Sequence, residues 1–515
     1  MLSTKITSRR RGVAVFCATV VLAVPALAGC DGGVPSAEAV GGPKPPVRQE
    51  PRQHPTRQLE PEMKLTTANR RASKDVIAAG WADAPYNYGP TVMIEGKRKR
   101  MWWCSQYGAA KPAGDDILYG AASSLDGPFR GARGKGKPRA VFSGSRRGFD
   151  AKHTCDPSVI KVDGVYYLYY TGARNDDHNF GNSIGVATSR DGVHWRRAND
   201  GKAIVTPSHT RKRKNAYGAG QPSAVYLDGW FYLMFTDTTA SAAGWNGAGQ
   251  FLLRSRDARF NAGVEALGPE GFERVPHTAA ARESSLVDAF SADLMWVDVL
   301  DAFAIAHQTT RGTTFTFWDR DFTVNPHRSV SIRGPWREGP GLVRTTNGHA
   351  PISRVDPCGT VPLDVVRATE NSDAPTDLRH FGMDLRGAYG CRRPELAMRL
   401  LDGYAMPSPE RTMDLITDGK LVRVERRSVA EALSRGVLEQ RPELLPELPV
   451  AARLRAGMPI LQSPQYSPGV VLDDGRLWPL GDEALSEELE RLNGSKSRTV
   501  SDQRWKSYPP GDPLG

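Results

Sequence analysis

The chain has 515 residues, including 52 glycines and 38 prolines, and its formal net charge is +11. This length allows one large domain or two to three smaller ones, and the high Gly and Pro content favours β structure with many turns over a helical bundle. The basic residues stand in short runs without interleaved exposed aromatics, which argues against a nucleic-acid partner.

Residues 1–29 have the pattern of an export signal. Lys5 and Arg9–Arg11 precede an apolar run over Val13–Leu27, and Cys30 follows the small residues Ala28 and Gly29. The apolar run is too short for a stable spanning helix. The pattern resembles a bacterial lipoprotein signal, which implies cleavage before Cys30, lipid on its thiol and an extracytoplasmic place at the outer face of the cell membrane. An ordinary cleaved signal peptide is the alternative.

Residues 30–78 are rich in Pro, Gln, Arg and Glu and poor in large apolar side chains. Such a segment buries too little surface to order itself, so we expect a disordered tether.

Four cysteines follow the tether, an even number that is typical of disulfides in an exported protein. They allow three connectivities, and sequence proximity favours Cys104–Cys155 and Cys358–Cys391. Because the chain has no CxxC motif and no clustered His pattern, we expect neither a metal nor another cofactor.

Residues 79–395 contain one pattern five times. In its clearest copy Asp156-Pro157 precedes two short strands that meet at Asp163-Gly164, a tight-turn pair. A second signature, clearest over residues 189–195 (SRDGVHW), follows in each unit. Four strands per unit, repeated in series, predict an all-β, five-bladed β-propeller. In a propeller the first strands line a shared funnel, so five aligned positions are expected to meet there: Gly89, Asp156, Gln221, Asp293 and Ala350.

The strand pattern PSVxxxDGxYYLYYTG and the turn SxDGxxW resemble the five-bladed propeller glycoside hydrolases around glycoside hydrolase family 43, which includes β-xylosidases and α-arabinofuranosidases. The resemblance spans about 310 residues. It implies hydrolysis of glycosidic bonds in an oligo- or polysaccharide by carboxylate acid/base catalysis. In that family three blades supply an Asp base, an Asp that tunes pKa and a Glu acid.

The two carboxylates among the five funnel positions are the candidate catalytic pair, with Asp156 as base and Asp293 or an unassigned Glu as acid. Gln221 replaces a titratable group and can only bind or orient the substrate. Glu338 lies in a Glu-Gly-Pro sequence like that of the family's acid, but its place after Trp336 predicts the end of an outer strand. Further substrate-binding candidates come from loops and aromatic strands: Asp177, His178, Trp103 and Asp237.

Residues 405–515 differ from the propeller in pattern. Asp418-Gly419 recurs as Asp474-Gly475, and helical stretches lie between the repeats. We expect a small α+β tandem-repeat region, which resembles wall-associated repeats of exported actinobacterial proteins and implies docking to a cell-wall polymer. A structural cap on the propeller is the alternative.

Two alternatives to a glycosidase stay open at this point. One is a non-catalytic glycan-binding propeller, because three of the five funnel positions hold neutral residues: Gly89, Gln221 and Ala350. The other is a surface scaffold with an empty funnel.

Overall fold

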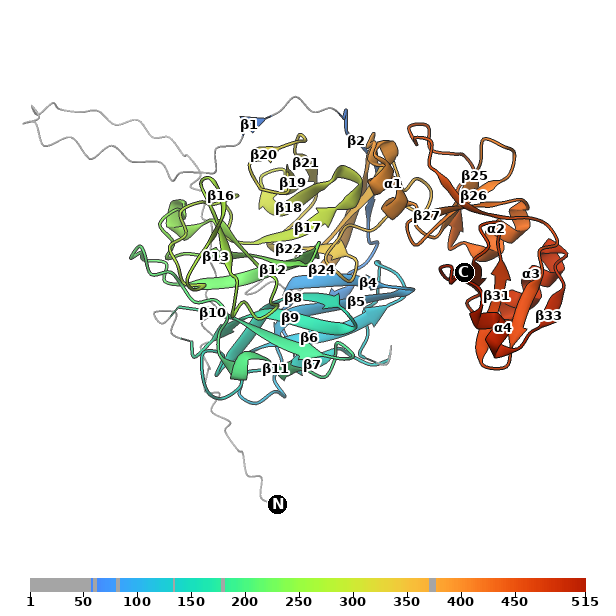
Figure 1. Ribbon diagram of the computed structural model, residues 1–515. Coiled ribbons are helices and arrows are strands. Elements are labelled where there is room, and N and C mark those ends of the chain that lie inside the picture. Colours follow the sequence, from blue (N-terminus) through green and yellow to red (C-terminus); the bar gives the residue numbers. More distant parts are fainter. Residues whose placement is uncertain (1–56, 59–62, 80–83, 133–134, 177–180, 370–376) are drawn as a thin grey trace, which may run out of the picture.

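The computed structural model describes residues 57–58, 63–79, 84–132, 135–176, 181–369 and 377–515. The predicted signal and most of the predicted tether, Cys30 included, lie outside these residues. The described chain is mostly β-sheet with few short helices. It forms a larger lobe of strands and a smaller lobe that holds the C-terminal residues, drawn in orange and red in Figure 1.

The larger lobe contains sets of consecutive antiparallel strands. The first set is β4 (Tyr88–Glu95), β5 (Arg98–Gln106), β6 (Asp115–Ala122) and β7 (Arg139–Phe142). The second is β8 (His153–Val162), β9 (Val165–Ala173), β10 (Ser183–Ser189) and β11 (Arg196–Arg197). The third is β12 (Ala219–Leu227), β13 (Trp230–Asp237), β14 (Gln250–Ser255), β15 (Glu265–Gly268) and β16 (Gly271–Arg274).

Two more sets complete this lobe. One is β17 (Ala292–Val297), β18 (Ala302–Thr309), β19 (Gly312–Trp318) and β21 (Val330–Ile332). The other is β22 (Glu338–Arg344), β23 (Thr360–Ala368), β24 (Asp377–Arg386) and β2 (Thr66–Ala72), with β3 (Ala78–Ala79) also on β24. The short strands β1 (Arg57–Gln58) and β20 (Val324–Asn325) pair with each other.

The first strands of these sets lie around one axis. β4 contacts β8, β8 contacts β12, β12 contacts β17, and β17 contacts β22. The ring closes where β22 pairs in parallel with β4. Backbone carbonyls of residues 346–348, just after β22, accept hydrogen bonds from β8, β12 and β17. This segment therefore covers the end of the axis that lies away from the strand starts.

Strand β2 connects the beginning of the larger lobe to its end. It pairs with β24, from which more than 300 residues separate it in sequence. Arg71 donates to Asp364 and Asp384, and His380 lies between Asp364 and Asp126. The predicted tether boundary at residue 78 is therefore wrong: β2 (Thr66–Ala72) supplies the outer strand of a sheet that would otherwise end at β24.

The smaller lobe begins with α1 (Pro394–Leu400) and contains two sheets. The first has β25 (Tyr404–Pro407), β26 (Met413–Thr417), β27 (Lys420–Val424), β28 (Gly436–Val437), β29 (Val450–Leu454) and helix α2 (Arg427–Leu433). The second has β30 (Ile460–Ser463), β31 (Tyr466–Val471), β32 (Leu477–Pro479), β33 (Ser497–Thr499) and helices α3 (Glu483–Asn493) and α4 (Asp502–Lys506). In both sheets a three-stranded meander precedes a helix, and the strand after the helix pairs in parallel with the first strand.

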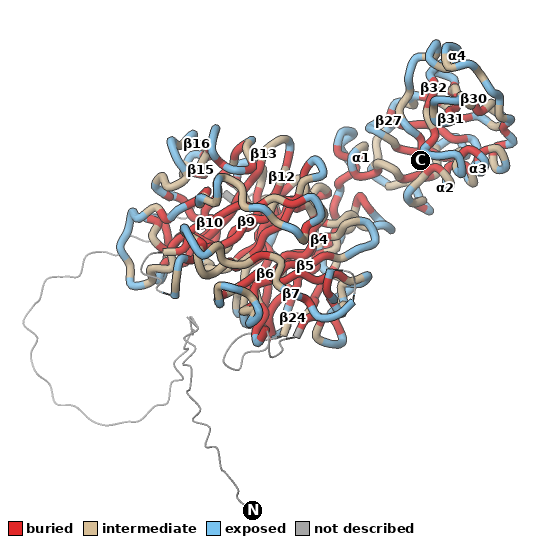
Figure 2. The backbone as a smooth tube through the Cα atoms, turned by 90° about the horizontal axis from the view of Figure 1, so that it is seen from below, coloured by how far each residue is buried: buried red, intermediate tan, exposed pale blue. Residues whose placement is uncertain are grey.

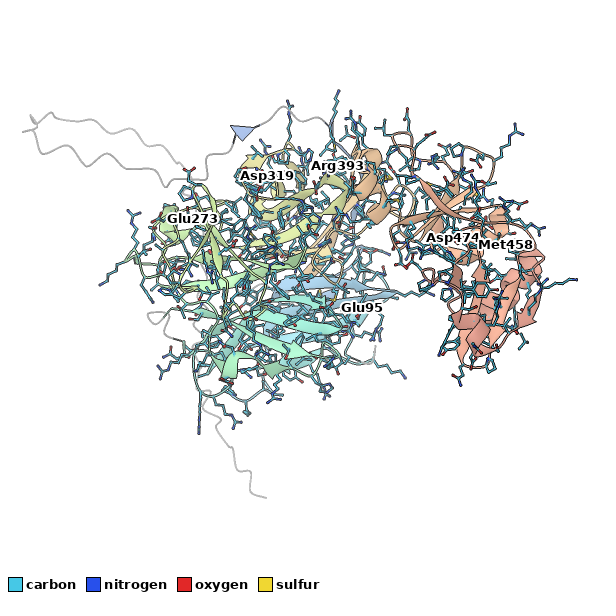
Figure 3. All side chains as sticks on the ribbon, viewed as in Figure 1. Glu95, Glu273, Asp319, Arg393, Met458 and Asp474 are labelled. Carbon is cyan, nitrogen blue, oxygen red and sulfur yellow. A yellow bond between two sulfur atoms is a disulfide. The ribbon has the colours of Figure 1, made fainter. Side chains whose placement is uncertain are left out.

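The hydrophobic core is continuous between the lobes. Figure 2 shows buried chain in both lobes and in the segment that joins them, and one cluster extends from Val299 in the larger lobe through Leu396 and Leu400 to Tyr404. Arg393, labelled in Figure 3, adds an ion pair to Asp301 at 2.7 Å. The two lobes therefore share packing as well as a peptide connection.

Two disulfides link separate elements. Cys104–Cys155 joins β5 to β8, and Cys358–Cys391 joins the loop before β23 to the turn before α1. These are the pairings that sequence proximity favoured. Within the described residues, no helix has the length and apolar character needed to cross a membrane.

Candidate functional site

A β-bulge marks the start of four of the five axial strands. The register slips between Tyr88 and Thr91 in β4, and at the matching places in β8, β12 and β22. At each of these register shifts the bulge includes a residue and the proline after it: Gly89-Pro90, Asp156-Pro157, Gln221-Pro222 and Gly339-Pro340. Because a bulge redirects the chain and the side chains beside it, these four segments turn toward the axis together.

The backbone at these bulges occupies the left-handed region. The residues before proline have φ values of +53° at Gly89, +46° at Asp156, +52° at Gln221 and +29° at Gly339. Glycine adopts such values freely, whereas for Gln they cost about 1–3 kcal/mol. The strain at Gln221 persists in a position that faces a pocket, which is the usual place for such strain.

The bulges correct the alignment of the fifth copy. The position that matches Asp156 in the last set is Gly339, not Ala350, and the titratable residue beside it is Glu338. Ala350 lies after β22, where its backbone N–H donates to Trp296 O. Strand β17 has no bulge, and Asp293 pairs in regular register with Ala306. Glu338 begins β22 and is therefore not at the end of an outer strand.

Asp156, Gln221, Asp293 and Glu338 all line one small cavity of about 40 Å³ where the axial strands begin. A cavity of this size holds about three water molecules. The side chains of Asp156 and Glu338 come from the second and last sets of strands. A Cβ at Gly89 would come within 3.0 Å of Asp156 Oδ1, so only glycine at residue 89 leaves that carboxylate its present place.

The two carboxyl groups differ in pKa. Burial raises the pKa of Asp156 to about 6, against hydrogen bonds from Thr171 and Tyr217 that lower it. Burial raises the pKa of Glu338 to about 8, and the negative charges of Asp156 and Asp115 add to the rise. At neutral pH Glu338 therefore holds a proton and Asp156 is mostly ionised.

Gln221 lines this cavity, and its side chain has an unpaired acceptor. Its backbone N–H donates to Thr171 Oγ1 at 2.7 Å, but its buried Oε1 has no hydrogen-bond partner among the described residues. Leaving a buried amide oxygen unpaired costs about 1–3 kcal/mol. A ligand hydroxyl that donates to Oε1 would remove this penalty.

Asp293 was predicted to be catalytic, and the structure gives it a different role. Its carboxylate accepts hydrogen bonds from the Ser223 hydroxyl and from the backbone N–H of Leu342 at 2.7 Å, and pairs with Arg344 at 3.2 Å. Arg344 is 1% exposed and also donates to Leu294 O at 2.7 Å. Asp293 is therefore the counter-ion of an arginine buried on the axis, and its oxygens are already occupied.

Two predicted substrate contacts are also corrected. Trp103 is 0% exposed and donates its indole N–H to Asn87 Oδ1 at 2.6 Å, so no ligand can stack on it. Asp237 is fully buried, pairs with Arg282 at 2.8 Å and accepts the N–H of Ser208. Asp177 and His178 lie outside the described residues.

A cluster of Asp115, His153 and Asp176 lies beside the disulfide Cys104–Cys155. Asp115 accepts a hydrogen bond from Tyr86, and its backbone N–H donates to His153 Nδ1 at 3.0 Å. His153 Nε2 lies 2.8 Å from Asp176. Burial lowers the pKa of His153, but these two carboxylates outweigh it and raise the pKa overall. Asp115 also comes within 4.8 Å of both disulfide sulfurs, which are bonded to each other and offer no thiolate to a metal.

Sequence reasoning misplaced Glu338, which lines the cavity, and missed Tyr217, which contacts Asp156. Tyr217 donates to Asp156 Oδ2 at 3.3 Å. Only Glu338 left a usable signal, because Gly339-Pro340 repeats the Gly-Pro pair of residues 89–90 at the start of another axial strand.

Comparisons with known proteins give local similarity only. No family model matches the chain. The arabinan endo-1,5-alpha-L-arabinosidase A of Aspergillus niger is 30% identical over 123 residues, which are 24% of this chain and 35% of that protein. The chain thus matches about a third of the length of this curated relative.

Solved structures with a similar course of the chain include three glycoside hydrolases. A family 117 glycoside hydrolase of Zobellia galactanivorans is 11% identical, with a TM-score of 0.38 over 63% of this chain and 91% of that one. The catalytic domain of a GH62 alpha-L-arabinofuranosidase of Coprinopsis cinerea is 12% identical, with a TM-score of 0.38 over 62% and 97%. A sucrose-6-phosphate hydrolase of Lactobacillus gasseri is 10% identical, with a TM-score of 0.40 over 69% and 64%.

Proposed function

We propose that this protein is an exported glycoside hydrolase built on a five-bladed propeller, with Glu338 as general acid and Asp156 as general base. The observation that carries the proposal is the pairing of two carboxyl groups in one cavity, with pKa values of about 8 and about 6. Five sets of antiparallel strands whose first strands ring one axis support the blade count.

The geometry divides the chemistry between these groups. Protonated Glu338 gives its proton to the glycosidic oxygen as the bond to the anomeric carbon breaks. Ionised Asp156 takes a proton from the water that attacks this carbon. One proton thus leaves Glu338 and one is taken up by Asp156, so that atoms and charge balance. Gln221 Oε1 accepts a hydrogen bond from a sugar hydroxyl and fixes the ring beside both carboxyl groups.

The substrate class in this proposal is an arabinose- or xylose-containing polysaccharide. The strand and turn motifs support it, as does the local match to the arabinanase of Aspergillus niger. The test uses soluble protein that starts after Cys30, assayed on aryl arabinofuranosides, aryl xylosides, arabinan and xylan. We expect turnover that falls at least about 100-fold in both Asp156→Asn and Glu338→Gln. Turnover that survives both substitutions, with the contaminating host enzymes excluded, would refute these assignments.

A non-catalytic glycan-binding protein is the second candidate, and the size of the cavity favours it. A volume of about 40 Å³ admits a protruding hydroxyl but not a whole sugar ring unless the walls move. Calorimetric titration with arabino- and xylo-oligosaccharides separates the two candidates. Binding without turnover, unchanged in Asp156→Asn, would favour the binding protein.

The place of the protein in the cell is part of the same proposal. The lipobox supports a lipid anchor on Cys30, and two disulfides fit an oxidising compartment outside the cytoplasm. The smaller lobe would then dock to a cell-wall polymer. Incorporation of labelled palmitate in the native host should occur in the wild type and disappear in Cys30→Ala; equal labelling of both would contradict the anchor.

A further inference from the structure

We infer that a groove lined by Arg70, Arg311 and Arg333, here called the arginine groove, binds an anionic glycan. It has a volume of about 590 Å³, compared with about 40 Å³ for the cavity at Asp156. Arg70 belongs to β2, Arg311 to the turn between β18 and β19, and Arg333 follows β21. The groove therefore lies between the outer strands of two neighbouring sets.

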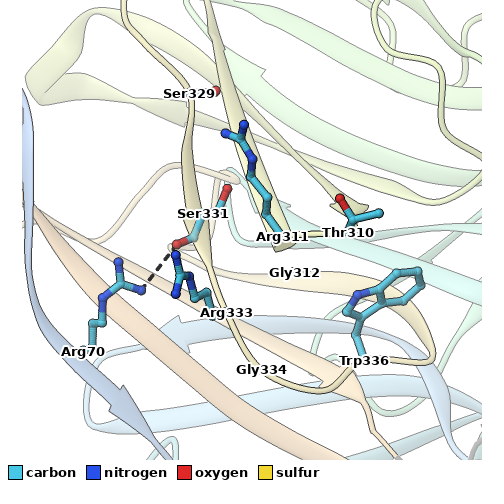
Figure 4. Close-up of a pocket in the computed structure, with 9 residues that line it drawn as sticks. All are labelled: Arg70, Thr310, Arg311, Gly312, Ser329, Ser331, Arg333, Gly334 and Trp336. Atoms are coloured by element: carbon cyan, nitrogen blue, oxygen red, sulfur yellow. Dashed lines mark hydrogen bonds between the residues drawn. The ribbon is translucent and has the colours of Figure 1, made fainter.

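The charges of the groove are uncompensated. The three arginines are exposed, and no carboxylate is among the described residues that line the groove. None of the three forms an ion pair within the described part of the chain. Among the described residues, their guanidinium groups form one hydrogen bond, from Arg70 Nη1 to Ser331 O at 3.5 Å. Figure 4 shows the three side chains around Ser331. Three like charges held together without an acid form a field that attracts anions.

The groups beside these charges suit a sugar chain better than a bare ion. Trp336 is half-buried at one end of the groove, and a flat aromatic ring covers the C–H face of a sugar. The exposed hydroxyls of Thr310 and Ser329 add hydrogen-bonding capacity. Guanidinium groups bind carboxylate or phosphate oxygens through paired N–H donors. Together these groups match a glycan that carries carboxylate or phosphate.

The arginine groove opens on the side of the sheets that carries the candidate active site. Thr309 pairs with Gly312 and His307 pairs with Ala292, so the turn holding Arg311 lies at the end where β17 begins. The chain then runs from Arg333 through Trp336 directly to Glu338. A bound chain can therefore extend from the groove toward the small cavity. The carbohydrate nature of the ligand rests on the proposed function, whereas its negative charge does not.

Direct binding tests this inference without relying on turnover. The probes are an oligogalacturonate, a poly(glycerol phosphate), a neutral arabino-oligosaccharide, inorganic phosphate and single-stranded DNA of similar length, titrated at low and high salt. We expect one of the two anionic polymers to bind more tightly than every other probe and to weaken with salt. Whichever binds identifies carboxylate or phosphate as the recognised group.

Variants locate the site. Arg311→Gln/Arg333→Gln should weaken polymer binding by about tenfold or more. The matched control Lys97→Gln/Arg190→Gln removes the same charge at exposed turns elsewhere and should change binding less than about twofold. Trp336→Ala should weaken polymer binding and leave phosphate binding unchanged.

The inference is wrong if neither polymer binds, if both double variants weaken binding equally, or if phosphate or DNA binds as tightly as the polymers. The titrations measure binding and not turnover, so a failure of the hydrolysis assay would not affect this result.

Discussion

Asp156 and Glu338 line the same cavity, and burial raises the pKa of both because it disfavours their ionised forms. The raised pKa of Glu338 makes the stability of the folded protein depend on pH. Its pKa of about 8 in the folded protein lies far above the value of 4.5 for a free glutamate. The unfolded chain therefore releases this proton at a lower pH than the folded chain does, and stability falls as pH rises between these two values.

Glu338→Gln should therefore stabilise the protein at pH 8. We expect a rise in melting temperature of roughly 2–5 °C at pH 8 and almost none at pH 4, because the neutral amide has no ionised form to bury. Glu273→Gln is the control, since Glu273 is exposed on β16 (Figure 3). A Glu338→Gln variant that melts like the wild type at both pH values would show that Glu338 is not buried beside Asp156.

Asp293 gives a second prediction, on stability. Asp293→Asn should lower the free energy of unfolding by about 3–5 kcal/mol, because it leaves Arg344 buried without its counter-charge. Urea unfolding measures this loss, and Asp293→Asn/Arg344→Met should recover part of it by removing the orphaned charge. A variant with wild-type stability but lost turnover would restore the catalytic role predicted from the sequence.

At the scale of elements, the closure of the larger lobe depends on β2 and on a buried charge cluster. Burial lowers the pKa of His380, but Asp364 and Asp126 outweigh it and raise the pKa above the ordinary 6.5. A raised histidine pKa contributes stability that is fully present below pH 6.5 and lost as pH rises through the folded value.

His380→Gln should therefore cost stability mainly in acid. The gap in melting temperature between wild type and variant should be largest near pH 5.5 and shrink toward pH 9. His194→Gln serves as the control, because the His194 side chain is 88% exposed. A gap that stays constant with pH would mean that His380 acts only through packing.

The sequence predicted the strands of the larger lobe well because its signals are local. Turn pairs such as Asp163-Gly164 and alternating apolar runs depend only on neighbouring residues. The turn signature at residues 189–192 is equally local: the Ser189 hydroxyl accepts backbone N–H bonds from Asp191 and Gly192. This explains why the motif recurs without carrying chemistry.

The site was harder to predict because it depends on register. Asp293 and Asp156 look equivalent in sequence, but of their two strands β8 has a bulge at the aspartate and β17 has none, and Asp293 pairs with Arg344. Glu338 was misplaced for the same reason: the sequence did not reveal that the last set of strands starts with β22 and not with a strand near Ala350. Strand β2 was missed because its pairing with β24 spans most of the chain.

At the scale of the whole molecule, the two lobes share a hydrophobic core, and Cys358–Cys391 fixes the segment that leads into the smaller lobe by closing a loop over a sequence separation of 33 residues. In Cys358→Ser/Cys391→Ser we expect the free energy of unfolding to fall by about 3–4 kcal/mol, since the unfolded chain gains the freedom of that loop. Differential scanning calorimetry with and without reductant checks this. An unchanged melting transition would show that the disulfide adds no stability to this segment.

The pH dependence of kcat/KM on the best glycoside substrate tests the central claim most directly. If Asp156 must be ionised and Glu338 protonated, activity should rise through about pH 6, fall through about pH 8, and lose its alkaline limb in Glu338→Gln. A profile that keeps both limbs in Glu338→Gln, or an absence of turnover on every glycoside while sugar still binds, would contradict the account of this pocket as a hydrolytic site.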